Sequence, residues 1–358
     1  MKTPRCTLRS LASELGLSKT TVSDALRGRG RVDPDTVERV RLAAKRSGYE
    51  TNPLAGALMA EMRRSRGDAF HGVLAAIDFK EAAVNMMHKP FHQALLEGIS
   101  RSANEQGFRM EIFTLGRGLL SVSRLDEILS SRGIHGMVVL PAWDAPDLTR
   151  LQWDRYAGVY TDYIIKFPSL HSVCSDHYRT MTRAMNILRA HGYRRPGLCI
   201  EKHRDERLQH RHSAGYVSAR DRAGDLGDVP PLFLDRLNRA EFMTWFKLHR
   251  PDSVICHFTE VIQWMEECGA RVPETHGYLS PNVIWRHQPC AGFDLQPAMI
   301  GARAAEVAIA MLFRNERGIP DWPAMTAIPA RWIDGPTLRA AQGAPGVETD
   351  FGEPKIMA

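Results

Sequence analysis

The sequence lacks the marks of exported and membrane-spanning proteins. No apolar run approaches the roughly 18 residues that a membrane-spanning helix needs. The start, Met1–Arg5, has no apolar signal-peptide core, so we expect a cytoplasmic location and no membrane partner. The six cysteines form no Cys-x-x-Cys pair, which favours structural thiols in a reducing compartment.

Motifs for catalysis and metal binding are missing too. There is no Gly-x-Ser-x-Gly, no Walker loop, and no Gly-x-Gly-x-x-Gly after a strand. We therefore expect no enzyme, no catalytic residue and no cofactor. His203, His210 and His212 cluster, but histidines at i and i+2 do not share a helix face and no cysteine completes a zinc pattern. A solvated basic helix is the favoured interpretation, and no metal site is expected.

Charge is distributed unevenly along the 358 residues. Residues 1–67 hold 14 Lys+Arg and 7 Asp+Glu, whereas residues 68–358 hold 33 and 34. A small basic module on a near-neutral body is typical of proteins that are attracted to nucleic-acid phosphates. The length suits such a headpiece followed by two further domains.

The basic stretch predicts a helix-turn-helix. Apolar positions at i, i+3, i+4 and i+7 indicate a first helix: Leu8, Leu11, Ala12 and Leu15. Ser18 can cap a second helix, whose polar stripe would enter the DNA major groove. The proposed groove contacts are Lys19, Thr20, Ser23, Asp24 and Arg27. Thr21 is open to two interpretations, a capping and packing residue or a DNA contact.

Two further helix starts follow. Asp33-Pro34 predicts a third helix that buries Val37, Val40 and Ala44. Asn52-Pro53 opens a segment of about two turns up to Leu58, which is too short to be stable alone. We expect that segment to fold only against a partner.

From residue 72 onward, short apolar runs alternate with helical patterns, which argues for parallel sheets covered on both faces. Predicted strands span 72–78, 109–113, 136–141, 156–160, 197–200, 231–235, 253–256 and 276–279. Predicted helices span about 91–106, 122–131, 177–191, 208–222, 239–248 and 261–268. Two doubly wound halves would form a cleft at the carboxyl ends of their strands.

The N-terminal residues resemble the headpiece of the lactose-repressor (LacI/GalR) family of bacterial transcriptional regulators. The resemblance is carried by Thr7–Ala12, Gly16–Ser18, Thr21–Ser23, Leu26, Val32, Thr36, Arg39-Val40, Gly48-Tyr49 and Asn52–Ala55. It implies a small all-α helix-turn-helix headpiece with a hinge helix, then an α/β body of two doubly wound parallel-sheet subdomains like the type I periplasmic binding proteins. Asp24 departs from the family, because many members carry an arginine there that reads a base.

The resemblance also implies domain boundaries. The headpiece would be 1–51, the hinge helix and linker 52–68, the two-lobed effector-binding and dimerisation domain 69–340, and a disordered tail 341–358. Lobe 1 would hold about 69–171 and 297–326, and lobe 2 about 172–296 and 327–340. The hinge would order on operator binding, with Asn52 at its start and Leu58 wedged in the minor groove.

For the cleft, the resemblance implies that Asp176 binds sugar hydroxyls. His212 stands where sugar-binding members carry an arginine, with Arg211 beside it, so either residue can contact the effector. The run His257-Phe258-Thr259 replaces a usual small-Asn-Asp element, which suggests an unusual effector. Aromatic side chains that would stack on a sugar, or else belong to the core, are Phe91, Trp143, Tyr163, Phe258 and Trp285.

We expect a homodimeric transcriptional regulator that acts as a repressor. It would bind a double-stranded DNA operator, and a small-molecule effector, a carbohydrate, would control that binding. Three alternatives stay open: a two-lobed solute-binding protein without a transcriptional role, an enzyme of doubly wound fold, and a regulator that binds no effector.

Overall fold

The computed structural model describes residues 8–26, 32–47, 71–80 and 89–341. The contacts divide the chain into two compact units, Met1–Ala69 with Phe313–Asn315, and Phe70–Leu312 with Glu316–Ala358, and each is described by itself. The predicted hinge segment 52–58 lies outside the described residues, as does nearly all of the predicted tail. In the parts that are described, no helix has the length and apolarity to span a bilayer.

The described part of the N-terminal unit contains the helices α1 (Leu8–Leu15), α2 (Lys19–Leu26) and α3 (Pro34–Arg46). Their apolar faces share one small core, formed by Leu11, Ala12, Val22, Ala25, Val40, Ala43 and Ala44. The helix-turn-helix pattern predicted from apolar spacing is therefore present.

Two predicted N-caps hold these helices. The backbone N–H of Thr21 donates to Ser18 Oγ at 3.0 Å, and that of Thr36 donates to Asp33 Oδ2 at 3.3 Å. Each bond satisfies one backbone donor that the first helical turn leaves without a partner. Both caps are confirmed.

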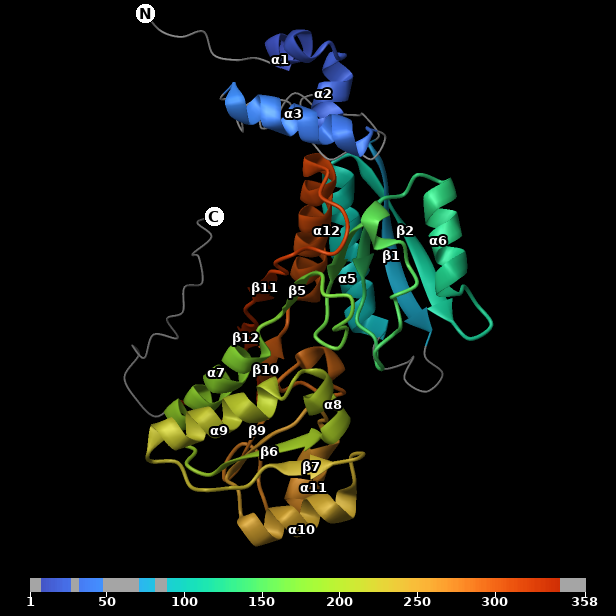
Figure 1. Cartoon of the computed structure of the whole chain (residues 1–358). Helices are drawn as coiled ribbons and strands as arrows, with labels where there is room; N and C mark the ends of the chain where they lie inside the picture. Colours follow the sequence, from blue (N-terminus) through green and yellow to red (C-terminus); the bar gives the residue numbers. More distant parts are fainter. Residues whose placement is uncertain (1–7, 27–31, 48–70, 81–88, 342–358) are drawn as a thin grey trace, which may run out of the picture. The chain divides into compact units, whose positions relative to one another are not determined.

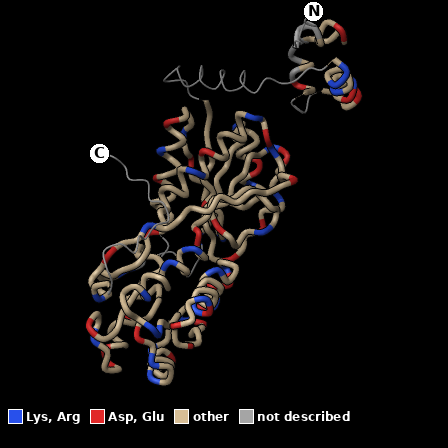
Figure 2. Tube along the Cα trace, turned by 90° about the vertical axis from the view of Figure 1, so that its left-hand side faces the viewer, with Lys and Arg blue, Asp and Glu red and all other residues tan. Residues whose placement is uncertain are grey.

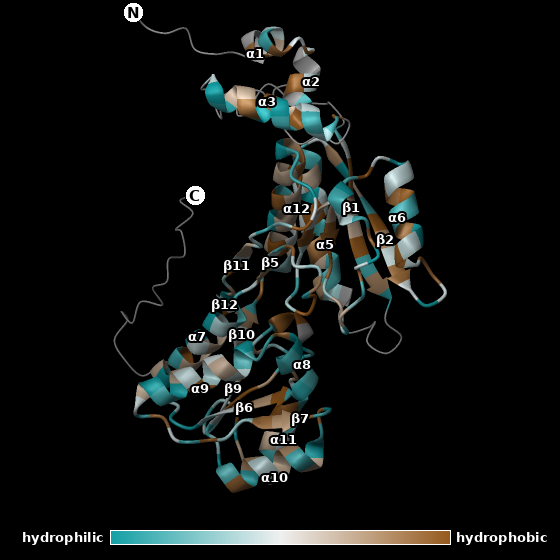
Figure 3. Ribbon diagram, viewed as in Figure 1, coloured by the Kyte–Doolittle hydropathy of each residue, from teal (hydrophilic) through white to brown (hydrophobic). Residues whose placement is uncertain are grey.

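The first half of the body, here called lobe 1, is built on a six-stranded parallel sheet of order β11-β5-β4-β3-β1-β2. Its strands are β1 (Gly72–Lys80), β2 (Phe108–Gly116), β3 (Gly136–Val139), β4 (Ala157–Tyr160), β5 (His171–Ser175) and β11 (Met325–Ile328). Helices α5 (Lys89–Glu105) and α12 (Pro297–Arg314) cover one face, and α6 (Val122–Ser131) with the short turn η1 (Trp153–Arg155) covers the other. Burial on both faces explains why the inner strands β1, β3 and β4 are largely apolar, and Figure 3 colours the chain by hydropathy.

The second half, lobe 2, has a sheet of order β12-β10-β9-β8-β6-β7, in which β12 alone runs antiparallel to its neighbour. Its strands are β6 (Pro196–Glu201), β7 (Leu232–Leu234), β8 (Ser253–Ile255), β9 (Gly277–Ser280), β10 (Ala291–Asp294) and β12 (Arg331–Ile333). Its helices are α7 (His177–Ala190), α8 (Lys202–Arg207), α9 (Arg211–Ala223), α10 (Arg239–His249) and α11 (Glu260–Glu267), with the turn η2 (Val283–Trp285). Helices α7 and α9 cover one face of this sheet, and α10 and α11 the other.

The first crossing between the lobes lies later in the chain than the sequence suggests. We expected lobe 1 to end near His171, but β5 pairs in parallel with β4 and with β11, so this strand belongs to lobe 1. The chain therefore crosses after Ser175, again between β10 and α12, and a third time between β11 and β12. Strand β11 also extends the second part of lobe 1 to Ile328.

Helices α5 and α12 touch backbone to backbone, and Figure 1 shows them side by side. A Cβ atom on Gly98 would lie 1.9 Å from the carbonyl oxygen of Ala298, and one on Gly301 would lie 2.1 Å from that of Leu95. Real Cβ atoms do not approach oxygen so closely. Both glycines are required by this packing.

We expect Gly301→Ala to destabilise the body by on the order of 2 kcal/mol, because the added methyl group must push two helices apart. Urea unfolding measures the loss. The matched control is Arg303→Ala on the exposed side of the same helix, which should change stability by less than about 0.5 kcal/mol. Equal stabilities for the two variants would contradict the close packing.

Candidate functional site

A pocket with about 610 Å³ of space, counting the part open to solvent, lies between the carboxyl ends of the two sheets. From lobe 1 it is lined by Phe91, His92, Pro141, Thr161, Asp162, Tyr163, Cys174 and Ser175. From lobe 2 it is lined by His177, Arg204, Arg207, Leu208, His257, Asn282 and Leu295. Most of these residues lie at the carboxyl end of a strand or within three positions after it, and this edge is where open α/β sheets bind ligands.

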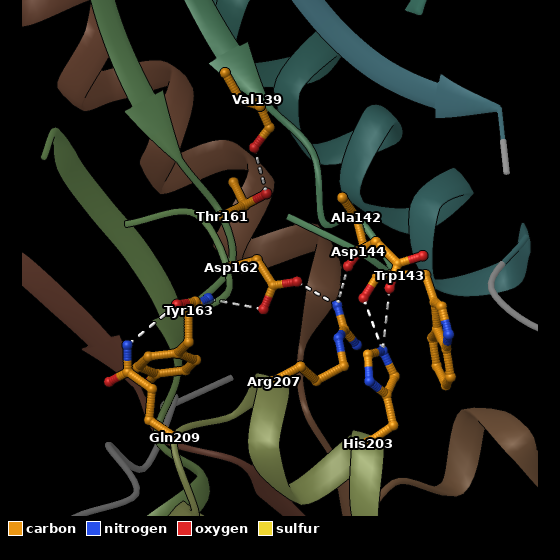
Figure 4. A network of polar contacts seen from close by, with 10 residues as sticks. All are labelled: Val139, Ala142, Trp143, Asp144, Thr161, Asp162, Tyr163, His203, Arg207 and Gln209. Carbon is orange, nitrogen blue, oxygen red and sulfur yellow. Dashed lines mark hydrogen bonds and ion pairs between the residues drawn. The ribbon is translucent and has the colours of Figure 1, made fainter. Parts of the chain in front are cut away.

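An ion pair joins the lobes at this pocket. The guanidinium of Arg207, at the end of α8, donates to the carboxylate of Asp162 and, at 2.6 Å, to the carbonyl oxygen of Ala142 (Figure 4). The Arg207 and Asp162 side chains are only 11% and 6% exposed. Burial raises the pKa of Asp162, and the nearby arginine opposes that rise.

Two further contacts link α8 and the turn after it to lobe 1 (Figure 4). His203 Nε2 lies 3.0 Å from the carbonyl oxygen of Trp143, and Gln209 Nε2 donates to that of Tyr163 at 3.1 Å. The Trp143 ring also lies 4.6 Å from the His203 ring, centroid to centroid. Helix α8 and the turn after it therefore hold the loops that follow β3 and β4.

We expect the ion pair to stabilise the body cooperatively. In a double-mutant cycle of Asp162→Asn and Arg207→Gln, the coupling free energy of unfolding should exceed about 1 kcal/mol, since either single change leaves a buried group unpaired. The control cycle uses the exposed pair Arg303 and Glu306, whose N and O atoms are 2.7 Å apart. Its coupling should stay below about 0.5 kcal/mol, and a similar value for the buried pair would refute the linkage.

Three histidines form a buried cluster at the lobe 2 side of the pocket. The rings of His177 and His212 are 4.9 Å apart, and those of His212 and His257 are 5.3 Å apart. His177 Nδ1 and both ring nitrogens of His212 are buried without a hydrogen-bond partner among the described residues. Burial lowers the pKa of His212 to about 4 and keeps those of His177 and His257 well below the usual value.

The charged groups that face the cluster act mostly in the same direction. Arg207 and Arg211 lower the pKa of His177, and Arg204 lowers those of His212 and His257. Asp205 alone opposes this, by raising the pKa of His212. The imidazoles are therefore neutral in the folded chain at neutral pH.

This neutrality predicts how stability depends on pH. The unfolded chain protonates these imidazoles below about pH 6.5 whereas the folded chain does not, so the free energy of unfolding should fall as the pH drops from 6.5 toward 4. His212 alone should contribute on the order of 3 kcal/mol over that range. Urea unfolding at several pH values measures the slope.

His212→Phe should flatten that slope, because phenylalanine keeps the ring and cannot titrate. The matched control is His287→Gln, which removes a histidine whose side chain is 67% exposed. A slope as steep in His212→Phe as in the control would show that the cluster does not drive the acid sensitivity.

Among the residues predicted to contact an effector, Phe91 lines this pocket. Asp176 instead caps α7, where its Oδ1 accepts from the backbone N–H of Arg179 at 3.0 Å. Arg211 lies over the Tyr163 ring at 4.3 Å and is not among the lining residues.

His212 and Phe258, which were also predicted to contact an effector, are buried in lobe 2. His212, 1% exposed, lies behind His177 and His257, and Phe258 belongs to the core between the sheet and α10 and α11. We expected a solvated basic helix around His203–His212. That prediction is wrong for Arg204 and His212, because both residues are buried. Of the remaining aromatic candidates, Tyr163 lines the pocket.

Sequence reasoning missed Asp162, Arg204, Arg207 and His177. His177 directly follows Asp176, a predicted effector contact, and that position was a usable signal. Asp162 and Arg207 are 45 positions apart, and no local pattern connects them.

In the headpiece, the predicted DNA contacts Lys19, Thr20, Thr21, Ser23 and Asp24 belong to α2. Thr21 takes part in the cap, since its hydroxyl lies 2.8 Å from Ser18 Oγ. Arg27, Asn52 and Leu58 lie outside the described residues. In the body, acidic and basic residues are intermingled, as Figure 2 shows.

The structure thus combines a helix-turn-helix unit with a two-lobed α/β body that has a pocket between its lobes. Residues 7–52 match the family model described as bacterial regulatory proteins, lacI family. The headpiece is therefore a LacI-family helix-turn-helix domain, and the resemblance to the LacI/GalR family is confirmed.

Curated relatives agree with this family. The chain is 29% identical over 136 residues to the transcriptional regulator CelR of Thermobifida fusca, which is 38% of this chain and 37% of that protein. It is 30% identical over 146 residues to AscG of Escherichia coli (strain K12), 37% of this chain and 43% of that regulator. The chain thus spans less than half of the length of these two relatives.

Solved structures match over nearly the whole chain. A complex of the transcriptional regulator CelR with cellobiose has a TM-score of 0.58 at 19% identity, over 93% of this chain and 100% of that one. The lac repressor dimer bound to operator and the anti-inducer ONPF has a TM-score of 0.55 at 14% identity, over 94% and 100%. These likenesses confirm the predicted fold class.

Proposed function

We propose that this chain is a sequence-specific transcriptional regulator, acting as a repressor, whose affinity for operator DNA is set by a small molecule in the pocket between the lobes. The observation that carries this proposal is the LacI-family helix-turn-helix on a body with an interlobe pocket. No catalytic step or cofactor is part of it, and it acts in the cytoplasm.

Two similar structures support the proposed class of effector and the proposed dimer on DNA. One similar structure holds cellobiose, and another is a dimer on its operator. We infer that the effector is a sugar or sugar derivative and that the regulator binds a pseudo-palindromic operator as a homodimer. Two copies of one headpiece naturally read two half-sites.

In the headpiece, α2 enters the major groove with Lys19, Thr20, Ser23 and Asp24, and Thr21 is a cap or a contact. Arg27, which follows the helix in sequence, is a further proposed contact. Segment 52–68 links the headpiece 1–51 to the body 69–340. The hinge helix within it orders on DNA, where Leu58 wedges between base pairs.

The pocket gives the regulation a physical basis. A ligand there touches both lobes, so it binds best to one arrangement of them and shifts the population toward it. The hinge segments of the two subunits then gain or lose their mutual packing. Helices of about two turns cannot persist without that packing.

We expect Leu58→Gly to weaken operator binding at least tenfold, on the order of the 1.4 kcal/mol or more that one apolar wedge supplies. Fluorescence anisotropy with operator fragments selected from genomic DNA measures this. Affinity of the unmutated chain should also fall steeply with salt, because bound phosphates release counterions.

Leu248→Gly is the control, because Leu248 is an exposed apolar residue at the end of α10 in lobe 2. It should leave DNA affinity unchanged. A chain that binds no DNA at low ionic strength, yet still binds sugars, would instead be a two-lobed solute-binding protein.

A further inference from the structure

The charged side chains that line the pocket are mainly cationic. Its described lining includes two guanidinium groups and three imidazoles but one carboxylate, that of Asp162. The carboxylate is already engaged, since Oδ1 accepts from the backbone N–H of Tyr163 at 2.7 Å and Oδ2 accepts from Arg207. The side-chain oxygen of Asn282 likewise accepts from the backbone N–H of Ile284 at 3.2 Å.

Two of the nitrogen atoms at the pocket are buried without a partner in the described part of the chain, Arg207 Nε and His177 Nδ1. Arg207 Nε can only donate, and a neutral imidazole donates from one nitrogen. Arg207 and His177 both line this one pocket. A buried donor without an acceptor is unfavourable, and a ligand that supplies the acceptor gains that free energy on binding.

Helix ends add to the preference for negative charge. His177 is the first residue of α7, and His212, whose ring contacts it, is the second residue of α9. The N-terminal end of each helix carries partial positive charge, which favours an anion nearby and disfavours an imidazolium. The neutral state of the histidine cluster agrees with that field.

Asp162 has the features of an internal substitute for such an anion. It is a buried carboxylate from lobe 1 that neutralises an arginine of lobe 2. Its charge is costly to bury, as its raised pKa indicates. An anion that enters from solvent and takes Arg207 would release Asp162, and it would break an interlobe ion pair at the same time.

Other ligand classes fit less well. A neutral sugar brings no negative charge to replace the Asp162 carboxylate, so it cannot take Arg207 without leaving a buried guanidinium unbalanced. A metal ion would need its ligands to converge, and no group of three or more such residues does so among those searched.

Resting on the proposed function, we propose that the effector is an acidic sugar derivative, bearing a carboxylate or a phosphate, whose anionic group displaces Asp162 from Arg207 and also accepts from His177. Effector binding then exchanges an interlobe ion pair for a ligand contact. This exchange couples recognition of the ligand to the position of the lobes.

The experiment titrates the full chain with anions at constant ionic strength, by thermal unfolding and calorimetry. The probes are inorganic phosphate and acetate, then glucose, glucuronate and glucose 6-phosphate as matched neutral, carboxylate and phosphate forms. Binding only the native state raises the unfolding temperature. At least one anion should do so while glucose does not, and the better of the two acidic sugars identifies the group.

Two variants of the same ion pair should shift anion affinity in opposite directions. Asp162→Asn should tighten it about tenfold, because a competitor is lost, and Arg207→Gln should weaken it at least tenfold. His177→Phe should weaken it as well. The control is Arg189→Lys, which changes an exposed arginine of the same lobe and should have no effect on anion affinity.

Three results would overturn the inference: stabilisation by no anion, binding of glucose as tightly as its acids, or equal shifts from Asp162→Asn and Arg207→Gln. Equal shifts would mean that the ion pair acts only on structure. Because DNA affinity is measured separately, tight operator binding with a neutral effector would leave the proposed function standing and reject this inference alone.

Discussion

The ion pair between Arg207 and Asp162 is the contact on which the pocket depends. It joins the end of α8 in lobe 2 to the loop after β4 in lobe 1, and both side chains are nearly buried. Neither lobe alone contains the site, because the strand ends that line it come from two sheets. A ligand that changes this ion pair therefore acts on both lobes at once.

The pocket is also connected to the close packing of helices α12 and α5 in lobe 1. Leu295 lines the pocket, and α12 begins two residues later and runs through the core of lobe 1. Gly98 and Gly301 let α12 lie directly on α5, which also carries Phe91 and His92 to the pocket. Two helices in backbone contact cannot shift independently, so a displacement at the pocket is shared by both.

Regular elements with a clear apolar period were accessible from the residues alone. Helix α6 has the bounds 122–131 that its pattern predicts, and the strands of lobe 1 follow their apolar runs within a few residues. The elements α8, β10, β11 and β12 were not predicted. Helix α8 consists of charged residues and a histidine, and β11 and β12 are partly exposed, so these three show no buried apolar run. Lobe 2 was expected to begin at about residue 172, which puts most of β5 in the wrong lobe. Only the pairing of β5 with β4 and β11 shows the sheet to which it belongs.

The headpiece depends on interactions within a few residues, such as Ser18 with Thr21 and Asp33 with Thr36, so spacing and residue type were enough to predict its helices. The pocket depends on contacts between distant segments. Local sequence patterns do not show whether His212 is solvated or buried. They also do not show that Asp162 meets Arg207, which lies 45 positions further along the chain. Burial and charge pairing arise only when two lobes bring their strand ends together, and the chemistry of the pocket was therefore decided by the tertiary structure.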